Sequence, residues 1–354
     1  MKTRAMRGIG GCILLLLAGC GLDDDASRTT SSDMVDLTMN VATTRSDGAP
    51  SATDGLPEAE KIHTLRIIIF DATDGVEHNT LIYDNPTTGV EEVAAKTFKV
   101  KKNSSKTIYL LANAEQLEGL DLTNPEGLKE RLDEYDRVSL EYLRQAEALP
   151  MSSTYSFNVQ ERNKDCGTLY VAYAATKFSF TFRNEMQDGK ALGVSGITVN
   201  QIASTSYLYP HGADKWLTDL LNKTVVSAYD IPATATHAPF QMEEFERVTI
   251  VAGTSYSFPP LYLTESKNTN GLDQKQSYSL GLKIGAGSDA SGDHVRDVEL
   301  IDGTRPLSSL FRSTHVNVEI VVKSLEQIEV ITGIYGMIEP WGELDPVPGT
   351  IVEI

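Results

Sequence analysis

Cys20 is the residue whose type and position point most directly to chemistry. It closes the segment Leu17-Ala18-Gly19-Cys20, which has the form of a lipobox, the signal for attaching lipid to a cysteine thiol. Residues 1–19 carry basic side chains followed by the apolar run Ile13–Leu17. Because that run is too short to cross a hydrocarbon core of about 30 Å, it is typical of a processed export signal. We expect 1–19 to be a lipoprotein signal peptide and Cys20 to carry lipid on its thiol and amino group.

The chain is strongly acidic, both locally and as a whole. Asp23-Asp24-Asp25 follows the lipobox and fits either a solvated spacer or an export tag that resembles those of surface lipoproteins in the Bacteroides group. Over the full length, 49 Asp and Glu residues against 31 Lys and Arg residues give a net charge of -18. A polyanion of this size repels phosphate backbones, so we expect no nucleic-acid partner.

No residue pattern supports a catalytic or metal centre. The six histidines are dispersed without His-Glu-x-x-His spacing, and neither a Gly-x-Ser-x-Gly elbow nor a Walker-type loop occurs. After removal of the signal peptide, Cys20 and Cys166 remain; Cys20 is lipidated, so no disulfide framework or cysteine metal site can form. The acidic stretch Gly285–Asp293 lacks the spaced ligands of a calcium loop and fits a hairpin turn better. We expect no catalytic residue, no metal and no cofactor.

The first element that follows the export signal is a short alternating segment. Its apolar residues Val35, Leu37, Met39 and Val41 alternate with polar ones, which predicts a half-buried strand. A stretch rich in Thr, Gly, Ala, Pro and Ser covers 43–57 and predicts an exposed linker that contains Arg45.

Most of the remaining chain also shows period-two patterning. Strands are predicted at 62–70, 81–83, 96–101, 107–112, 155–159, 169–183, 196–202, 248–251, 261–264, 278–284, 315–322 and 328–338. Between Pro125 and Leu149, apolar residues recur at helical spacing and predict one or two surface helices. Many short strands without alternating strand and helix units predict an all-β fold built from β-sandwiches.

The length of the chain, 354 residues with 41% hydrophobic content, is sufficient for two cores. The polar stretch Asn184–Lys190 is a predicted boundary between them. We expect a propeptide with the alternating strand at 20–45, an N-terminal domain at 46–184, and a C-terminal domain with a terminal tail at 185–354.

A series of short segments along nearly the whole chain resembles the fimbrillin-type (type V) pilins of the Bacteroides and Porphyromonas group. Besides the lipobox, they are Thr43-Thr44-Arg45, 65–71, 98–100, 108–113, 149–152, 206–210, 261–266 and Phe311-Arg312-Ser313-Thr314-His315-Val316. One departure is Ser313, where Asn is expected after the arginine. The resemblance implies two tandem transthyretin-like β-sandwich domains with short helical insertions.

The resemblance also implies a structural subunit of cell-surface fimbriae, shaft or tip, that supports adhesion and biofilm formation. Its lipidated precursor would be anchored in the outer membrane, where an arginine-specific protease would cut after Arg45 and leave Ser46 as the new N-terminus. Loss of the strand at 35–41 would open a groove, and a strand from another subunit of a homo- or heteropolymer would fill it.

The C-terminal segment offers candidate donor residues for such an exchange: Ile334, Ile338, Trp341, Ile351 and Ile354. Pro340, Pro346 and Pro348 interrupt a long pairing register, so shaft and tip roles both stay open. The alternatives are an uncleaved fimbrial anchor, or a monomeric surface lipoprotein that binds glycan or host protein. A host or bacterial adhesion ligand is compatible with each of these roles.

Overall fold

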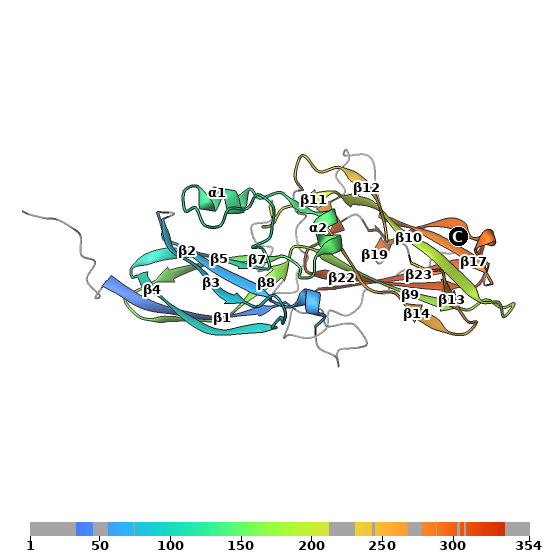
Figure 1. Cartoon of the computed structure of the whole chain (residues 1–354), viewed down its shortest axis with the longest axis horizontal. Coiled ribbons are helices and arrows are strands. Elements are labelled where there is room, and N and C mark those ends of the chain that lie inside the picture. Colours follow the sequence, from blue (N-terminus) through green and yellow to red (C-terminus); the bar gives the residue numbers. More distant parts are fainter. Residues whose placement is uncertain are drawn as a thin grey trace, which may run out of the picture.

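The computed structural model is an elongated molecule with the N-terminal part of the described chain at one end and the C-terminal part at the other (Figure 1). The structure describes residues 33–44, 56–73, 75–211, 231–242, 245–267, 278–287, 289–302, 305–307 and 309–336. Among these residues, no helix is long and apolar enough to cross a membrane.

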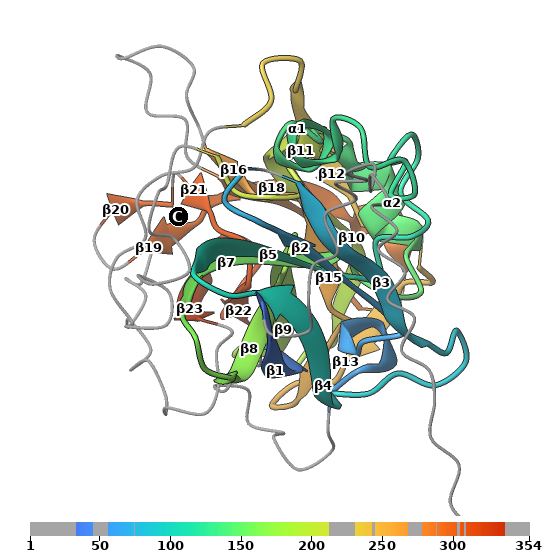
Figure 2. The ribbon, with the colours of Figure 1, turned by 90° about the vertical axis from the view of Figure 1, so that its left-hand side faces the viewer.

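The N-terminal part is built around one seven-stranded sheet in the order β3-β2-β5-β7-β8-β1-β4. Its strands are β1 (Met34–Thr43), β2 (Thr64–Phe70), β3 (Val76–Asp84), β4 (Glu92–Lys101), β5 (Ser104–Ala112), β7 (Met151–Val159) and β8 (Lys164–Tyr173). Pairing between β7 and β8 is confined to Met151 with Tyr173 and Ser152 with Ala172, so the sheet turns sharply there. The two parts on either side of this turn form two layers (Figure 2), and their buried apolar side chains belong to one common core.

The two edges of this sheet also approach each other. The His78 ring of β3 meets the Phe98 ring of β4 edge-on at 5.2 Å, and His78 Nε2 lies 2.6 Å from the carbonyl oxygen of Lys99. Glu77 Oε1 accepts from the backbone N–H of Lys101 at 3.2 Å. The layer β8-β1-β4 is therefore connected to the layer β3-β2-β5-β7 along both sides of the core.

The C-terminal part contains two further sheets around a second core. The first has the order β12-β10-β17-β18 with β13 also on β10, and the second has the order β14-β9-β22-β23 with β15 also on β9. Their strands are β9 (Thr176–Asn184), β10 (Leu192–Ala203), β12 (His237–Gln241), β13 (Val248–Ile250), β14 (Ser255–Ser257), β15 (Leu261–Leu263), β17 (Ser279–Ala286), β18 (His294–Glu299), β22 (Thr314–Val322) and β23 (Ile328–Gly336). The alternation of β9 points Phe178, Phe180 and Phe182 into this core, where each is fully buried.

Shorter elements decorate the two cores. The helices are α1 (Leu128–Asp133) and α2 (Leu140–Gln145), both within the range predicted to be helical. Among the described residues, 3-10 turns cover Glu58–Glu60 and Ala290–Gly292. The two-residue strands there are β6 (Val138–Ser139), β11 (Thr205–Ser206), β16 (Ser266–Lys267), β19 (Ile301–Asp302), β20 (Arg305–Pro306) and β21 (Ser309–Leu310). The all-β prediction with short helical insertions is confirmed.

The segment predicted as one strand at 169–183 is two strands in different cores. It breaks at Ala174-Ala175, where Ala174 N–H donates to the carbonyl of Pro150 and the carbonyl of Ala175 accepts from Ser313 N–H. The predicted N-terminal domain at 46–184 includes the strand β9, but β9 packs in the second core. Small residues without a Gly or Pro turn signal hid the break. We therefore propose a domain boundary at Ala174-Ala175 instead of after Asn184.

Candidate functional site

The strand β1 lies in the middle of its layer, with a partner on each side. It pairs antiparallel with β4, where Leu37 lies opposite Phe98, and parallel with β8, where Leu37 lies opposite Lys164. Both ladders shift register at the centre of β1, between Met39 and Val41 on one side and between Thr38 and Asn40 on the other. Removing β1 would leave an unpaired edge on β4 and another on β8.

The inward face of β1 is an unbroken apolar row. Val35 is 6% exposed, Leu37 0%, Met39 1% and Val41 1%. The structure brings all four predicted residues together in the first core, where they join residues of β2 and β5. The alternation of the sequence is thus sufficient to place this strand, because each residue step turns the side chain to the opposite face.

The outward face of β1 is held by polar contacts with both neighbours. Lys99 Nζ on β4 lies 2.5 Å from Asp36 Oδ1, and the Thr38 and Thr97 hydroxyls are 2.9 Å apart. Asn163, just before β8, accepts from the Asp36 N–H at 2.9 Å. Because Lys99 is largely exposed, its ion pair adds little stability, and the buried apolar row dominates the retention of β1.

The C-terminal end of β1 is buried up to the last described residue before the linker. Thr43 N–H donates to the carbonyl of Glu91 at 2.9 Å, and Thr44 N–H donates to the carbonyl of Val171 at 3.1 Å. Thr44 is 0% exposed, and its hydroxyl lies 3.5 Å from that of Ser313. The expectation of an exposed linker from residue 43 is therefore wrong for Thr43 and Thr44.

Ser313 connects the end of β1 to the junction between the two cores. Its backbone has a φ of 53°, in the left-handed region where Asn is enriched among non-glycine residues. This conformation accounts for the Asn expected at this position. The adjacent Arg312 is 0% exposed and forms a two-point ion pair with Glu265, with Nε donating to Oε2 at 2.9 Å.

Arg312 also bonds to the segment Tyr207-Leu208, whose Leu208 is buried in the first core, and approaches β7. Its guanidinium donates to the carbonyls of Leu208 at 2.6 Å and Tyr207 at 2.7 Å, and one nitrogen lies 3.4 Å from the hydroxyl oxygen of Ser152 on β7. A buried guanidinium with this many acceptors rigidly fixes the segments it joins.

A second buried cluster at the junction surrounds Glu60. Its Oε1 accepts from Lys177 Nζ at 2.5 Å and from the Tyr262 hydroxyl at 2.6 Å, while its carbonyl accepts from the Tyr173 hydroxyl at 2.7 Å. The pKa of the Tyr262 hydroxyl is raised, mainly by burial and secondly by the adjacent Glu60 carboxylate. The sequence did not reveal this cluster, because Glu60 has the residue type and neighbours of an ordinary surface position. The features of the sequence that could have indicated it are the predicted strands that contain Tyr173 and Tyr262.

Of the other predicted site residues, the structure describes Ile334 alone. Ile334 lies in β23, with its backbone paired to Val316 of β22. Cys20, Arg45, Ser46, Ile338, Trp341, Ile351 and Ile354 lie outside the described residues. Asp293, in the stretch considered for calcium, instead binds Arg247, with Nη2 and Oδ1 at 2.9 Å.

Burial also shifts the pKa values of Cys166 and His315. Burial raises the pKa of the half-buried Cys166 thiol. His315, 2% exposed, contacts the Ser179 hydroxyl oxygen through Nε2 at 2.8 Å, and burial together with nearby Lys177 lowers its pKa to about 4. Within the described ranges, no group of three or more His, Cys, Asp and Glu side chains is arranged to hold a metal ion.

Comparison with known proteins places this arrangement in context. Residues 35–196 match the family model of the major fimbrial subunit protein FimA, and this range begins within β1. Fimbrilin from Porphyromonas gingivalis aligns with a TM-score of 0.54 and 14% identity over 87% of this chain and 99% of that chain. The tip fimbrial protein Mfa3 from the same species, with C-terminal truncation, aligns with a TM-score of 0.50 and 14% identity over 86% and 99%.

A third solved structure extends the likeness to another genus. A candidate cell adhesion protein from Parabacteroides distasonis has a TM-score of 0.56 and 13% identity over 88% of this chain and 99% of that chain. At such identities these likenesses establish the fold. No curated protein sequence matches the chain.

Proposed function

We propose that this chain, whose residues 35–196 match the family model of the major fimbrial subunit protein FimA, is a fimbrial subunit assembled by exchange of β1 for a strand of another subunit. The family match supports a fimbrial structural or adhesion subunit of the cell surface, with other fimbrial subunits as partners, and does not support an enzyme. The observation that carries the exchange is the position of β1, paired on both sides and buried along its apolar face.

The energetics explain why β1 would block assembly until it leaves. Burying four apolar side chains at roughly 1.5 to 3 kcal/mol each gives about 6 to 12 kcal/mol before ordering costs. That is comparable to the whole stability of a typical domain. Once β1 is gone, β4 and β8 present open edges around an apolar slot, and such edges recruit a strand. A donor strand from another subunit would form a persistent joint.

The precursor would be lipidated at Cys20 and anchored in the outer membrane, and an arginine-specific protease would release it by cutting between Arg45 and Ser46. Burial of Thr44 supports a controlled release, because a protease that binds the residues before Arg45 in extended form needs their N–H groups free from the sheet. Cleavage would then depend on transient opening of the last residues of β1.

The donor strand of this chain would come from the segment after β23. Ile334 is already paired with Val316 of β22, which argues against Ile334 as a donor residue. The remaining candidate donor residues are Ile338, Trp341, Ile351 and Ile354. Removing residues 350–354 tests this directly. A shaft subunit so shortened accepts a partner but ends the filament, whereas a tip subunit is incorporated as before.

Cleavage at Arg45 can be tested by substitution in cells. Arg45→Ala is expected to leave a lipidated precursor that keeps β1 and is absent from sheared filaments. Arg28→Ala is the matched control. Cutting at Arg28 would remove the lipid but leave β1 attached, so strand exchange does not depend on Arg28. Normal incorporation of Arg45→Ala would favour an uncleaved anchor and overturn the exchange model.

A further inference from the structure

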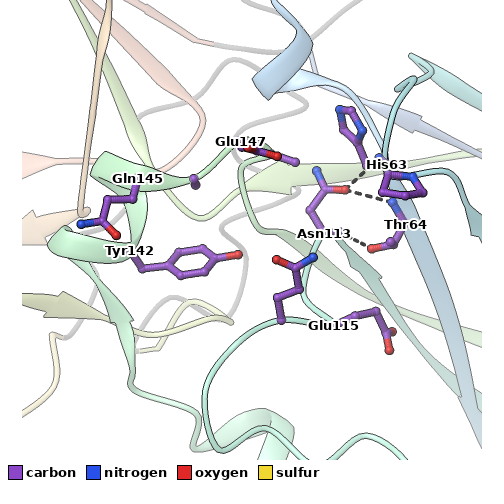
Figure 3. A pocket seen from close by; sticks show the side chains of 11 residues that line it. His63, Thr64, Asn113, Glu115, Tyr142, Gln145 and Glu147 are labelled. Atoms are coloured by element: carbon purple, nitrogen blue, oxygen red, sulfur yellow. Dashed lines mark hydrogen bonds between the residues drawn. The ribbon is translucent and has the colours of Figure 1, made fainter.

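A pocket of about 470 Å³ opens on the N-terminal part of the molecule, away from the groove that β1 fills. One wall comes from the start of β2 and the residues after β5, including Asn113 and Glu115; the other comes from α2 and the residues after it, including Tyr142 and Glu147 (Figure 3). This volume lies within the range of about 300 to 1,000 Å³ typical of small-ligand sites. Nothing in strand exchange uses this pocket.

The wall that contains Asn113 is rigid. The Asn113 side chain accepts from the N–H groups of His63 and Thr64 and donates to the carbonyls of Lys61 and Leu149. Its backbone has a φ of 56°, so the turn after β5 has a specific conformation.

The next part of this wall is fixed by an ion pair. Arg66 holds the Glu115 carboxylate at two points, with Nε to Oε1 at 2.6 Å and Nη2 to Oε2 at 2.9 Å. A surface fixed in this way pays little ordering cost when a ligand binds.

The opposite wall presents polar groups that are free to bind. Tyr142 extends from α2 across the opening, with its hydroxyl toward the wall that contains Asn113 (Figure 3). The Ser139 hydroxyl caps α2 by accepting from Tyr142 N–H at 3.0 Å, and buried Leu143 anchors the helix. Within the described part of the chain, the side chains of Tyr142 and Glu147 on this wall make no hydrogen bond, and neither does the side chain of Gln116 on the wall that contains Asn113.

The chemistry of these groups selects the ligand. None of the described residues that line the pocket is Lys or Arg, and the chain carries a net charge of -18, so anionic ligands are disfavoured. Glu115 is already paired with Arg66, which leaves exposed Glu147 as the one unpaired carboxylate among the described lining residues and makes a strong cation site unfavourable. A phenol ring beside amide and carboxylate oxygens matches a pyranose, which offers an apolar face and hydroxyls that both donate and accept.

We propose that this pocket binds a neutral sugar residue of a surface glycan. The inference rests on the proposed role of the chain as a surface fimbrial subunit, since that role brings the pocket into contact with glycans. Tyr142 packs against the sugar ring, and Gln116 and Glu147 bond to its hydroxyls. The floor around Asn113 sets the depth to which the ring enters.

The test is binding of the mature soluble chain to a panel of neutral mono- and disaccharides by calorimetry and on a glycan array. Tyr142→Ala is expected to lower the affinity for the sugar that binds best by about tenfold or more, and Tyr142→Phe by less, because the ring is retained. Glu147→Gln, on the exposed rim, keeps the fold and weakens binding by a few-fold. Tyr256→Ala, an exposed tyrosine on β14, is the matched control and leaves binding unchanged.

The proposal is overturned if no neutral sugar binds, if folded Tyr142→Ala binds as the parent does, or if an oligolysine peptide binds in place of sugars. Filament incorporation of Tyr142→Ala is measured in parallel. Normal assembly of Tyr142→Ala together with lost sugar binding supports the pocket as a sugar site. Assembly of the Arg45 and tail variants tests strand exchange alone.

Discussion

Replacing Leu37 by Ala tests whether the buried row of β1 is what holds the subunit closed. Leu37 is 0% exposed and faces the first core, so truncation removes buried methyl groups and leaves a cavity. Leu→Ala changes at such sites cost about 2 to 5 kcal/mol. If all of this loss appears in the dissociation of β1 from the cleaved chain, release accelerates by about 30-fold to several thousand-fold, since each 1.4 kcal/mol is a factor of ten.

The assay cleaves purified precursor with trypsin at Arg45 and follows both release of the β1 peptide by mass spectrometry and polymer growth by light scattering. Thr38→Ala, on the outward face of β1, is expected to change release by only a few-fold. Leu282→Ala, fully buried in the second core, is the matched control: it lowers stability by a similar amount without accelerating release. Equal release from Leu37→Ala and the parent chain would refute the reasoning.

Three further predictions concern the junction and its surroundings. Arg312→Ala leaves the Glu265 carboxylate buried and unpaired and should lower the free energy of unfolding by about 3 to 5 kcal/mol in urea titrations. A loss below about 1 kcal/mol would contradict the stabilising role of the Arg312–Glu265 ion pair. Ser313→Val places a β-branched residue in the left-handed region and should cost about 1 to 2 kcal/mol, whereas Ser313→Asn should be tolerated better; the reverse order in thermal melts would exclude backbone conformation as the cause. Since burial lowers the pKa of His315 to about 4 while its unfolded value is near 6.5, its neutral form contributes fully to stability above pH 6.5, and about 3 kcal/mol is lost as pH falls from 6.5 to 4. Stability curves for His315→Asn should be flatter over that window, and an unchanged slope would assign the acid sensitivity to other groups.

The sequence was sufficient for elements whose pattern is local. The alternation from Val35 to Val41 predicts β1 and its buried face, and the leucine spacing after Pro125 predicts the region of α1 and α2. Period-two patterning cannot reveal which strands share a core, because the parallel pairing of β9 with β22 joins residues more than 130 positions apart. This is why the break at Ala174-Ala175 was missed.

Buried charges were equally hard to predict. Arg and Glu are residue types usually found on the surface, and the burial of Arg312 and Glu60 depends on partners from distant segments. Arg312 bonds to Glu265 and to the carbonyl of Leu208. Glu60 bonds to Lys177 and Tyr262. In the sequence, only the family resemblance distinguishes the segment Phe311-Arg312-Ser313-Thr314. The burial of Thr44 likewise follows from tertiary contacts with Val171 and Ser313, which override the turn-rich composition after it.

The N-terminal residue of the subunit within filaments tests the central claim most directly. Filaments are sheared from cells, dissociated, and their subunits sequenced from the N-terminus and weighed by mass spectrometry. The account predicts a chain that begins at Ser46 and lacks the β1 sequence Met34–Thr43. Subunits that retain lipidated Cys20, or that begin at Thr29 with β1 still attached, would contradict it.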